Sequence, residues 1–206
     1  MRMYTALKTL GLSFVLLFLC IACDRPQLSP LPADAVILAF GDSITFGTGA
    51  PQGQDYPAVL ARLIGRRVVN GGVPGETTAQ GKERLPKLLE EIQPHLVLLE
   101  EGGNDFLRRV DRDTTRRNLQ AMIDSCRDFG VPVVLIAVPQ PGLLLSDADL
   151  YQELAESNRL LLIDDELADI LSDRDLKSDT IHPNAAGYRR LAEAVMERLR
   201  QHGAIE

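Results

Sequence analysis

The segment Asp179-Thr180-Ile181-His182 carries two side chains suited to proton transfer. An aspartate and a histidine three residues apart on a tight turn can lie on one side of it, so that the carboxylate accepts the proton of one imidazole nitrogen. The other nitrogen is then free as a base, and an unperturbed histidine pKa of about 6.5 suits that task near neutral pH. Taken alone, the pair also fits a surface histidine beside an aspartate that caps a turn.

Ser43 is the candidate nucleophile for such a base. It lies in Gly41-Asp42-Ser43, directly after the apolar run Val36–Phe40. A serine at the end of a strand can present its hydroxyl at the rim of a sheet, with its own N–H directed at a developing oxyanion. The hydroxyl is a weak nucleophile until a base takes its proton. The plain alternative is a turn or a helix N-cap, where Asp and Ser are favoured.

Two further segments offer hydrogen-bond donors for an oxyanion. In the glycine-rich stretch Asn70–Thr77, Gly75 stands just before an expected helix, where its N–H is free to donate. In Gly102–Asp105, the Asn104 amide is an uncharged donor, which suits an oxyanion hole. Each segment alone also fits an ordinary turn. Together the four segments predict a serine hydrolase, and without a GxSxG sequence the common α/β-hydrolase layout is not expected.

These motifs need a fold that brings distant segments together. Five apolar runs read as strands buried on both faces of a parallel sheet; they are Val36–Phe40, Arg67–Asn70, Leu96–Glu100, Val131–Val138 and Leu160–Asp164. Helices are expected between and after them, over residues 55–65, 76–92, 112–129, 148–158 and 184–202. We expect Pro86 to bend or shorten the second helix, and Pro183 to be the first residue of the last one.

This order of elements predicts an α/β fold, a three-layer α/β/α sandwich with a five-stranded parallel sheet of the flavodoxin-like type. In such folds the active site lies beyond the carboxyl ends of the strands. Three of the four motifs directly follow an expected strand, as that placement requires.

The four segments resemble the four sequence blocks of the SGNH hydrolase, or GDSL esterase, superfamily, over about Val36 to Arg200. The resemblance is closest to bacterial arylesterases and multifunctional acyl-thioesterase/lysophospholipases, through the stretches Val68–Gly75, Leu85-Pro86 and Glu101–Asp105. Ile44 stands where the GDSL motif has Leu, a conservative change. The resemblance implies that residues 35–206 form an SGNH hydrolase domain that needs no cofactor.

The resemblance also implies a role for each site residue. Ser43 is the nucleophile, His182 the base, and Asp179 the carboxylate that orients it. The Ser43 and Gly75 N–H groups and the Asn104 amide form the oxyanion hole. The implied reaction is hydrolysis of carboxylic esters or thioesters through an acyl-enzyme.

The expected substrate is a small-molecule or lipid acyl ester, such as an aryl or short alkyl ester or a lysophospholipid. Phe106 and Leu107, just past Asn104, are the candidate substrate-binding residues. The run Leu143–Leu145 either forms a wall for an acyl chain or packs in the core. Arg108 and Arg109 either meet an anionic head group or stay solvated.

Residues 1–22 are typical of a lipoprotein signal peptide. Arg2 and Lys8 precede the apolar run Leu10–Ala22, which is too short for a comfortable membrane span. Ala22-Cys23 resembles a lipobox, with Cys20 where Leu is usual, so Cys23 is the expected lipidation site. An ordinary secretory signal or an uncleaved anchor are the alternatives.

Residues 23–34 are expected to form the lipidated cysteine and an extended tether, because this stretch holds three prolines and no apolar period. The protein is then exported, facing the periplasm or the cell exterior, and bound to a membrane through its N-terminal lipid. We expect it to be a monomer.

The charge balance argues against nucleic acid as a partner. Residues 23–206 keep 20 Lys and Arg against 29 Asp and Glu, since Arg2 and Lys8 are the basic residues removed with the signal. Cys126 lies in an expected amphipathic helix and reads as a buried apolar side chain rather than half of a disulfide. No metal site is expected, because His95 and His202 lack companion ligands.

Two other functions keep the same fold. One is an acetylesterase acting on acetylated glycans, which the lack of Trp for stacking on sugars disfavours. The other is a catalytically idle SGNH binding lipoprotein, which the intact motifs disfavour.

Overall fold

The computed structural model describes residues 27–140 and 146–206 of the 206-residue chain. The predicted signal peptide, Cys23 and the run Leu143–Leu145 lie outside these ranges, so the predictions made for them stay predictions. None of the helices in the described ranges has the length and apolarity needed to cross a membrane.

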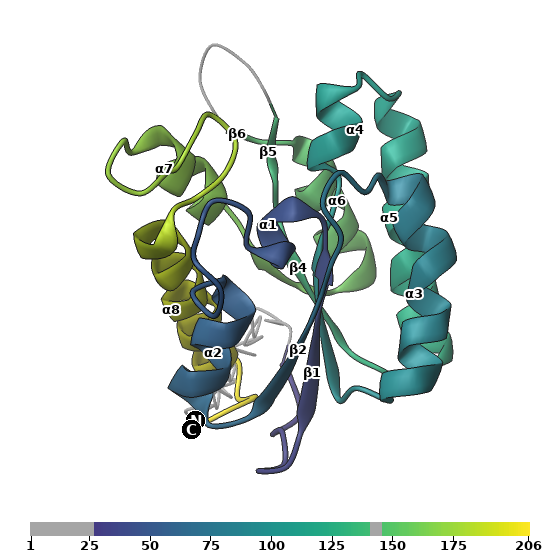
Figure 1. Ribbon diagram of the computed structural model, residues 1–206. Coiled ribbons are helices and arrows are strands. Elements are labelled where there is room, and N and C mark those ends of the chain that lie inside the picture. The colour runs from purple at the N-terminus through teal and green to yellow at the C-terminus, as the bar shows by residue number, and fades with distance from the viewer. Residues whose placement is uncertain (1–26, 141–145) are drawn as a thin grey trace, which may run out of the picture.

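Five parallel strands form one sheet in the order β2-β1-β3-β4-β7 (Figure 1). They are β1 (Val36–Gly41), β2 (Arg67–Gly72), β3 (Leu96–Glu100), β4 (Val133–Ile136) and β7 (Leu161–Ile163). The predicted five-stranded parallel sheet is therefore confirmed. The chain runs from β1 to β2 on one side and then to β3 on the other. The strand order thus reverses between β1 and β3, the place where open α/β sheets bind their ligands.

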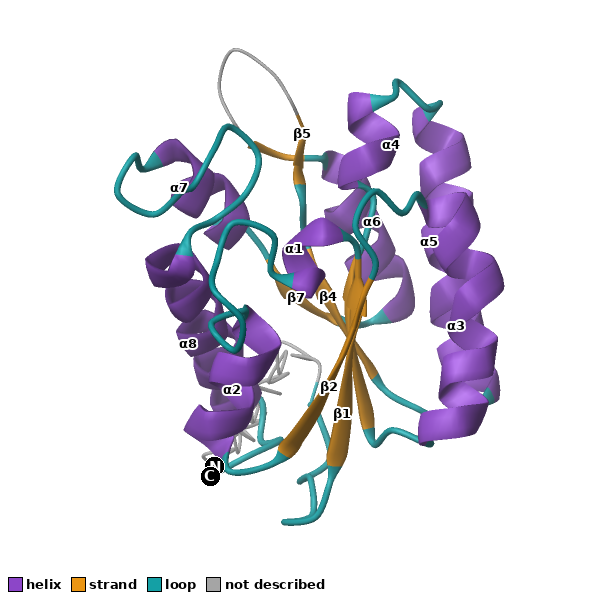
Figure 2. Cartoon of the chain, viewed as in Figure 1, coloured by secondary structure: helices purple, strands orange, loops and turns teal. Residues whose placement is uncertain are grey.

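Helices cover both faces of the sheet and complete the predicted three layers (Figure 2). On one face α2 (Tyr56–Ile64) packs against α8 (Ala185–Gln201). On the other face α3 (Thr78–Ile92) packs against α5 (Arg112–Asp128), which contacts α6 (Asp149–Asn158). All five helices were expected within about two residues of these bounds.

The core explains why the strands read as unbroken apolar runs. Every side chain of β3 and β4 is buried, because helices lie on both sides of these central strands. Burying each leucine or valine contributes roughly 1.5–3 kcal/mol. β2, at the edge of the sheet, is only partly buried, and its sequence is correspondingly more polar.

Pro86 does not shorten α3 as expected. The helix continues through it to Ile92, although a proline ring removes one backbone hydrogen bond. Leu85 and Leu89, one turn apart, are both buried against the core, so tertiary packing holds the helix through the proline.

The last helix begins at Ala185 rather than at Pro183. Asn184 is its N-cap, and its Oδ1 accepts hydrogen bonds from the N–H groups of Ala186 at 2.9 Å and Gly187 at 3.1 Å. An asparagine that caps in this way sets the helix start at Ala185, two residues later than the proline rule suggests.

Three short helices and a small hairpin were not expected. The helices are α1 (Ser43–Phe46), α4 (Gly103–Leu107) and α7 (Glu166–Ser172), and β5 (Pro139–Gln140) pairs antiparallel with β6 (Ser146–Asp147). Elements of two to seven residues are too short to show a hydrophobic period. Both α1 and α4 follow central strands directly, so they lie at the carboxyl edge of the sheet (Figure 2).

Candidate active site

Ser43 is the first residue of α1, immediately after the end of β1. Asp42 caps this helix, its Oδ1 accepting a hydrogen bond from the Ile44 N–H at 3.0 Å. Thr45 holds the turn to the neighbouring strand, because its hydroxyl donates to Glu100 Oε2 at 2.8 Å. The Ser43 hydroxyl is therefore fixed at the carboxyl edge of the sheet, beside β3.

His182 and Asp179 complete a hydrogen-bonded chain with Ser43. His182 Nε2 lies 3.0 Å from Ser43 Oγ, and His182 Nδ1 lies 2.8 Å from Asp179 Oδ2. With Nδ1–H donating to the carboxylate, Nε2 is left to accept the serine proton. The geometry is that of a Ser-His-Asp triad.

The turn that carries Asp179 and His182 is fixed by hydrogen bonds from its own backbone. Asp179 Oδ1 accepts hydrogen bonds from the N–H groups of Ile181 at 2.8 Å and His182 at 2.9 Å. Asn184 Nδ2 donates to the Asp175 carbonyl at 2.8 Å, and Tyr188 of α8 donates to the Thr48 carbonyl at 2.7 Å. The last bond ties the C-terminal helix to the loop that follows Ser43.

The surroundings of Asp179 favour the ionised form of its carboxyl group. Its partial burial acts to raise the pKa, but hydrogen bonds from the His182 ring and from the Ile181 and His182 N–H groups outweigh this effect and hold the pKa below its ordinary value. An ionised carboxylate at this position favours the protonated imidazole that general base catalysis creates.

The loop that contains Gly75 lines the same pocket as His182. Gly75 has φ +79°, a conformation that favours glycine. Arg108 donates from Nη2 to the Gly75 carbonyl at 2.9 Å, which fixes the loop from behind. In the described part of the chain, no hydrogen bond engages the N–H of Gly75 or that of Ser43. Both N–H groups are therefore available as donors.

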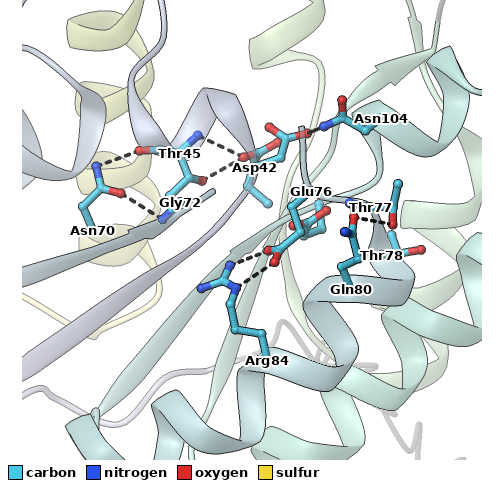
Figure 3. Close-up of polar contacts among 12 residues, drawn as sticks. Asp42, Thr45, Asn70, Gly72, Glu76, Thr77, Thr78, Gln80, Arg84 and Asn104 are labelled. Carbon is cyan, nitrogen blue, oxygen red and sulfur yellow. Dashed lines mark hydrogen bonds and ion pairs between the residues drawn. The ribbon is translucent and has the colours of Figure 1, made fainter. Parts of the chain in front are cut away.

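Asn104 lies at the start of α4, with its side chain directed at Asp42 (Figure 3). Its Nδ2 donates to Asp42 Oδ2 at 3.0 Å, which uses one of the two amide hydrogens. The second hydrogen remains for a ligand.

One pocket of about 560 Å³ joins these groups. Ser43, Gly75, Asn104 and His182 all line it, whereas Asp179 stands behind the His182 ring. The rest of its wall is largely apolar and includes Ile44, Pro74, Leu107, Val138, Pro139, Leu171 and Ile181.

The two candidate substrate-binding residues differ in position. Leu107 lines the pocket and is 47% exposed at its mouth. Phe106 is not among the lining residues; its ring packs edge-on against Tyr151, with 6.3 Å between ring centroids. Arg108 holds the Gly75 loop, as described above, and does not line the pocket.

Asp42 is a site residue that the sequence reasoning treated only as a cap. Its side chain is 2% exposed, and burial raises its pKa to about 6, although hydrogen bonds from Ile44 and Asn104 and the nearby His182 act to lower it. Glu100 and Glu101 are fully buried next to it, and burial, reinforced by the Asp42 charge, raises the pKa of both well above the ordinary value. In the sequence, the two glutamates at and just after the end of the apolar run Leu96–Glu100 were the one sign of a buried acidic cluster around Asp42.

Asp105 is a second residue whose role the sequence did not reveal. It is buried, and its carboxylate accepts hydrogen bonds from the Thr78 N–H at 2.8 Å and the Thr78 hydroxyl at 2.5 Å. This contact joins the start of α3 to α4. It therefore keeps the Gly75 loop and Asn104 at a fixed spacing.

Cys126 is fully buried in α5, as expected of an apolar side chain, and burial raises the pKa of its thiol to about 12. Within the described ranges, His, Cys, Asp and Glu side chains form no group of three or more that could hold a metal ion.

A sequence profile of the GDSL-like lipase/acylhydrolase family matches residues 39–190. The match spans β1 to the first part of α8 and includes all five proposed catalytic residues. The chain belongs to this family. The resemblance drawn from the four sequence blocks is thereby confirmed.

Proteins of similar sequence and structure are consistent with this family assignment. The chain is 32% identical to an arylesterase of Vibrio mimicus over 202 residues, which cover 93% of this chain and 98% of the relative. It is 29% identical to thioesterase 1/protease 1/lysophospholipase L1 of Escherichia coli K12, over 79% of this chain and 82% of the relative. The crystal structure of AlinE4, an SGNH-hydrolase family esterase, matches with 32% identity and a TM-score of 0.64, covering 82% of this chain and 96% of that one. The GDSL protein described here is a carboxylic ester hydrolase with the SGNH fold.

Proposed function

We propose that this GDSL hydrolase cleaves single-chain carboxylic esters and thioesters, with Ser43 as nucleophile, His182 as general base and Asp179 as the carboxylate that orients it. The observation that carries the proposal is the chain of contacts from Ser43 Oγ to His182 Nε2 at 3.0 Å and from His182 Nδ1 to Asp179 at 2.8 Å, open to an apolar pocket.

In the first half of the reaction, Ser43 Oγ attacks the carbonyl carbon while its proton passes to His182 Nε2. Asp179 stabilises the imidazolium, which then protonates the leaving alcohol or thiol. An acyl-enzyme on Ser43 remains. In the second half, His182 takes a proton from water, the resulting hydroxide attacks the acyl carbon, and the acid leaves as Ser43 regains its proton.

The tetrahedral oxyanion forms where three donors converge on the pocket. Two are the unengaged N–H groups of Ser43 and Gly75, and the third is the second hydrogen of the Asn104 amide. Removal of one such donor generally costs about 10²–10³-fold in kcat.

The shape and lining of the pocket favour a single acyl or aryl group. Its volume of about 560 Å³ lies in the range of small-molecule sites, and among the described residues that line it there is no Lys or Arg. Leu107 and Ile181 extend its apolar lining to the surface. The substrates we propose are aryl and alkyl esters and single-chain lipid esters such as lysophospholipids. The names of the two relatives, an arylesterase and a thioesterase/lysophospholipase, support this choice.

We further propose that the protein is an exported monomer anchored through a lipid on Cys23. The support is the sequence: a basic start, a short apolar run, and a cysteine directly after a small residue, followed by a proline-rich tether.

Hydrolysis of p-nitrophenyl esters, from acetyl to palmitoyl, tests the catalytic assignment. Wild-type protein should release p-nitrophenol, and Ser43→Ala should not. Ser125→Ala is the matched control, because Ser125 lies on α5, outside the pocket, where its hydroxyl donates to the Ala121 carbonyl. A fluorophosphonate should label Ser43, as mass spectrometry of the peptide would show. Activity that survives Ser43→Ala would refute the assignment.

A further inference from the structure

The first residues that the structure describes are bound to the end of the chain. The Leu28 N–H donates to the His202 carbonyl at 3.0 Å, and the Leu31 N–H donates to the Ala204 carbonyl at 2.8 Å. Both leucines are partly buried against the hydrophobic core. Arg66 adds a third contact, donating to the Leu31 carbonyl at 3.0 Å. We call this contact of residues 28–31 with residues 202–204 the clasp.

The clasp and the pocket lie at opposite ends of α8. The helix begins at Ala185, three residues after His182, and ends at Gln201, one residue before the clasp. Its 17 residues span about 25 Å, because an α-helix rises 1.5 Å per residue. Figure 1 shows the C-terminus toward one end of the molecule and α4 and α7 toward the other, with α1 between them.

The tether is shorter than this separation. Cys23 precedes Gln27 by four residues, which span at most about 14 Å even when fully extended. If the pocket mouth lay flat on a membrane, the clasp would stand about 25 Å above the surface. A lipid on Cys23 could not then reach the bilayer while the clasp stays closed.

From this geometry we propose that the anchored enzyme keeps its pocket turned away from the membrane that holds it. Its substrates are single-chain acyl esters that arrive from the aqueous phase as monomers, and not esters held in its own membrane. The inference rests on the lipid anchor at Cys23 and on the ester hydrolysis proposed above. A single-chain amphiphile leaves a bilayer readily, so it can reach the pocket through water, whereas a two-chain lipid rarely does so.

The test uses the full-length lipidated protein in phosphatidylcholine vesicles with two reporter esters of the same fatty acid. One reporter is a water-soluble fluorogenic ester, presented as monomers. In the other, the same ester is attached near the head group of a two-chain phospholipid in the enzyme's own vesicles. We expect the soluble reporter to be cleaved at least about tenfold faster than the vesicle-held one. Equal rates on the two reporters would overturn the proposal.

Lengthening the tether should remove the restriction. An insert of about twenty Gly and Ser residues between Pro26 and Gln27 has a mean span near 25 Å, enough to let the pocket face the membrane. We expect it to raise cleavage of the vesicle-held reporter several-fold and to leave the soluble reporter unchanged. The same insert after Glu206 is the matched control and should change neither rate. If the insert between Pro26 and Gln27 had no effect on the vesicle-held reporter, the clasp would not set the orientation.

The same samples separate failure of this inference from failure of the proposals beneath it. Retention of the protein on vesicles, compared with Cys23→Ala, reports the anchor. Cleavage of the soluble reporter, compared with Ser43→Ala, reports the esterase. Loss of either overturns the inference together with the proposal that it rests on. With both intact, the ratio of the two reporter rates decides the orientation alone.

Discussion

The side-chain amide of Asn104 donates a hydrogen bond to the buried carboxylate of Asp42, 3.0 Å away. Asp42 precedes the proposed nucleophile Ser43 in the chain and also caps its helix by accepting from the Ile44 N–H. One carboxylate thus sets the position of both the Ser43 turn, which follows β1, and the proposed oxyanion donor Asn104, which follows the neighbouring strand β3.

Asp42→Asn should lower kcat by about 10–100-fold and change KM little, because the effect falls on the transition state. Ile44 and Asn104 donate to different oxygens of Asp42, Oδ1 and Oδ2. An asparagine keeps an oxygen at only one of these two positions, so its NH₂ group would face the other donor. Steady-state kinetics on a p-nitrophenyl ester measure this. Asp128→Asn, at an exposed position of α5, is the control. A tenfold rise in KM at unchanged kcat would place Asp42 in substrate binding instead.

Asp179→Asn should reduce kcat by roughly 10²–10⁴-fold, since an asparagine does not hold the His182 tautomer or stabilise its charge. The loss should persist at every pH at which the wild type is active. Asp175→Asn, an exposed neighbour on the same loop, should retain full activity. Wild-type kcat in Asp179→Asn would remove Asp179 from the catalytic group.

Gly75→Ala should lower kcat by about 10–100-fold, because the positive φ disfavours a side chain and a relaxed loop would move the N–H away from the oxyanion. An added Cβ itself finds space, with Arg108 Nη2 the nearest atom at 3.8 Å. Gly53→Ala is the matched control: its φ is +77°, nothing lies within 4 Å of the added Cβ, and it does not line the pocket. Both variants should lose a similar roughly 1–2 kcal/mol of stability, and only Gly75→Ala should lose activity. An equal loss of kcat in both would point to a global effect.

Glu100→Gln should stabilise the protein increasingly, relative to wild type, as the pH rises. Burial and the Asp42 charge raise the folded-state pKa of Glu100 above its ordinary value of 4.5, so the folded protein binds this proton more tightly than the unfolded chain. The free energy of unfolding therefore falls by up to about 1.4 kcal/mol per pH unit as the pH climbs from about 4.5 toward the raised pKa. A glutamine has no proton to lose and avoids this fall.

Thermal unfolding at pH 5 and pH 8 measures the effect. The difference in Tm between Glu100→Gln and wild type should be more favourable to the variant at pH 8. Glu91→Gln, on the exposed side of α3, should show no such trend. A difference that stays constant between the two pH values would mean that Glu100 titrates as in the unfolded chain.

Leu107→Ser should reduce kcat/KM for long acyl chains by about tenfold and leave acetyl esters almost unaffected, because the half-exposed leucine contributes apolar contact at the pocket mouth. Leu63→Ser replaces a leucine of similar exposure on α2, outside the pocket, as the control. Chain-length profiles of the three proteins give the comparison. A uniform loss across all chain lengths would indicate damage to the catalytic group.

The sheet could be predicted well from the sequence because strands buried on both faces appear as continuous apolar runs. The predicted and observed bounds of β3, Leu96–Glu100, are the same at both ends, because five buried residues in a row differ clearly from the pattern of a helix. The short helices α1 and α4 show no recognisable hydrophobic pattern in the sequence, yet they decide which way neighbouring side chains point. Leu107 and Phe106 are adjacent and both apolar, yet one faces the pocket and the other Tyr151.

Polar side chains were harder to interpret, because their partners come from other elements. Asp42 reads as a helix cap in the sequence, and it is one. Its second contact, with Asn104, lies 62 residues further along the chain and depends on the pairing of β1 with β3. Only the assembled sheet brings such pairs together.

The separation of 139 residues between Ser43 and His182 also bears on when the enzyme becomes active during its synthesis. The proposed nucleophile Ser43 is made long before His182 and before the α8 helix that packs on α2. A nascent or prematurely terminated chain therefore holds a serine without its base. Ester hydrolysis by the proposed Ser43–His182 pair therefore requires that synthesis has passed His182 and that α8 has packed on α2.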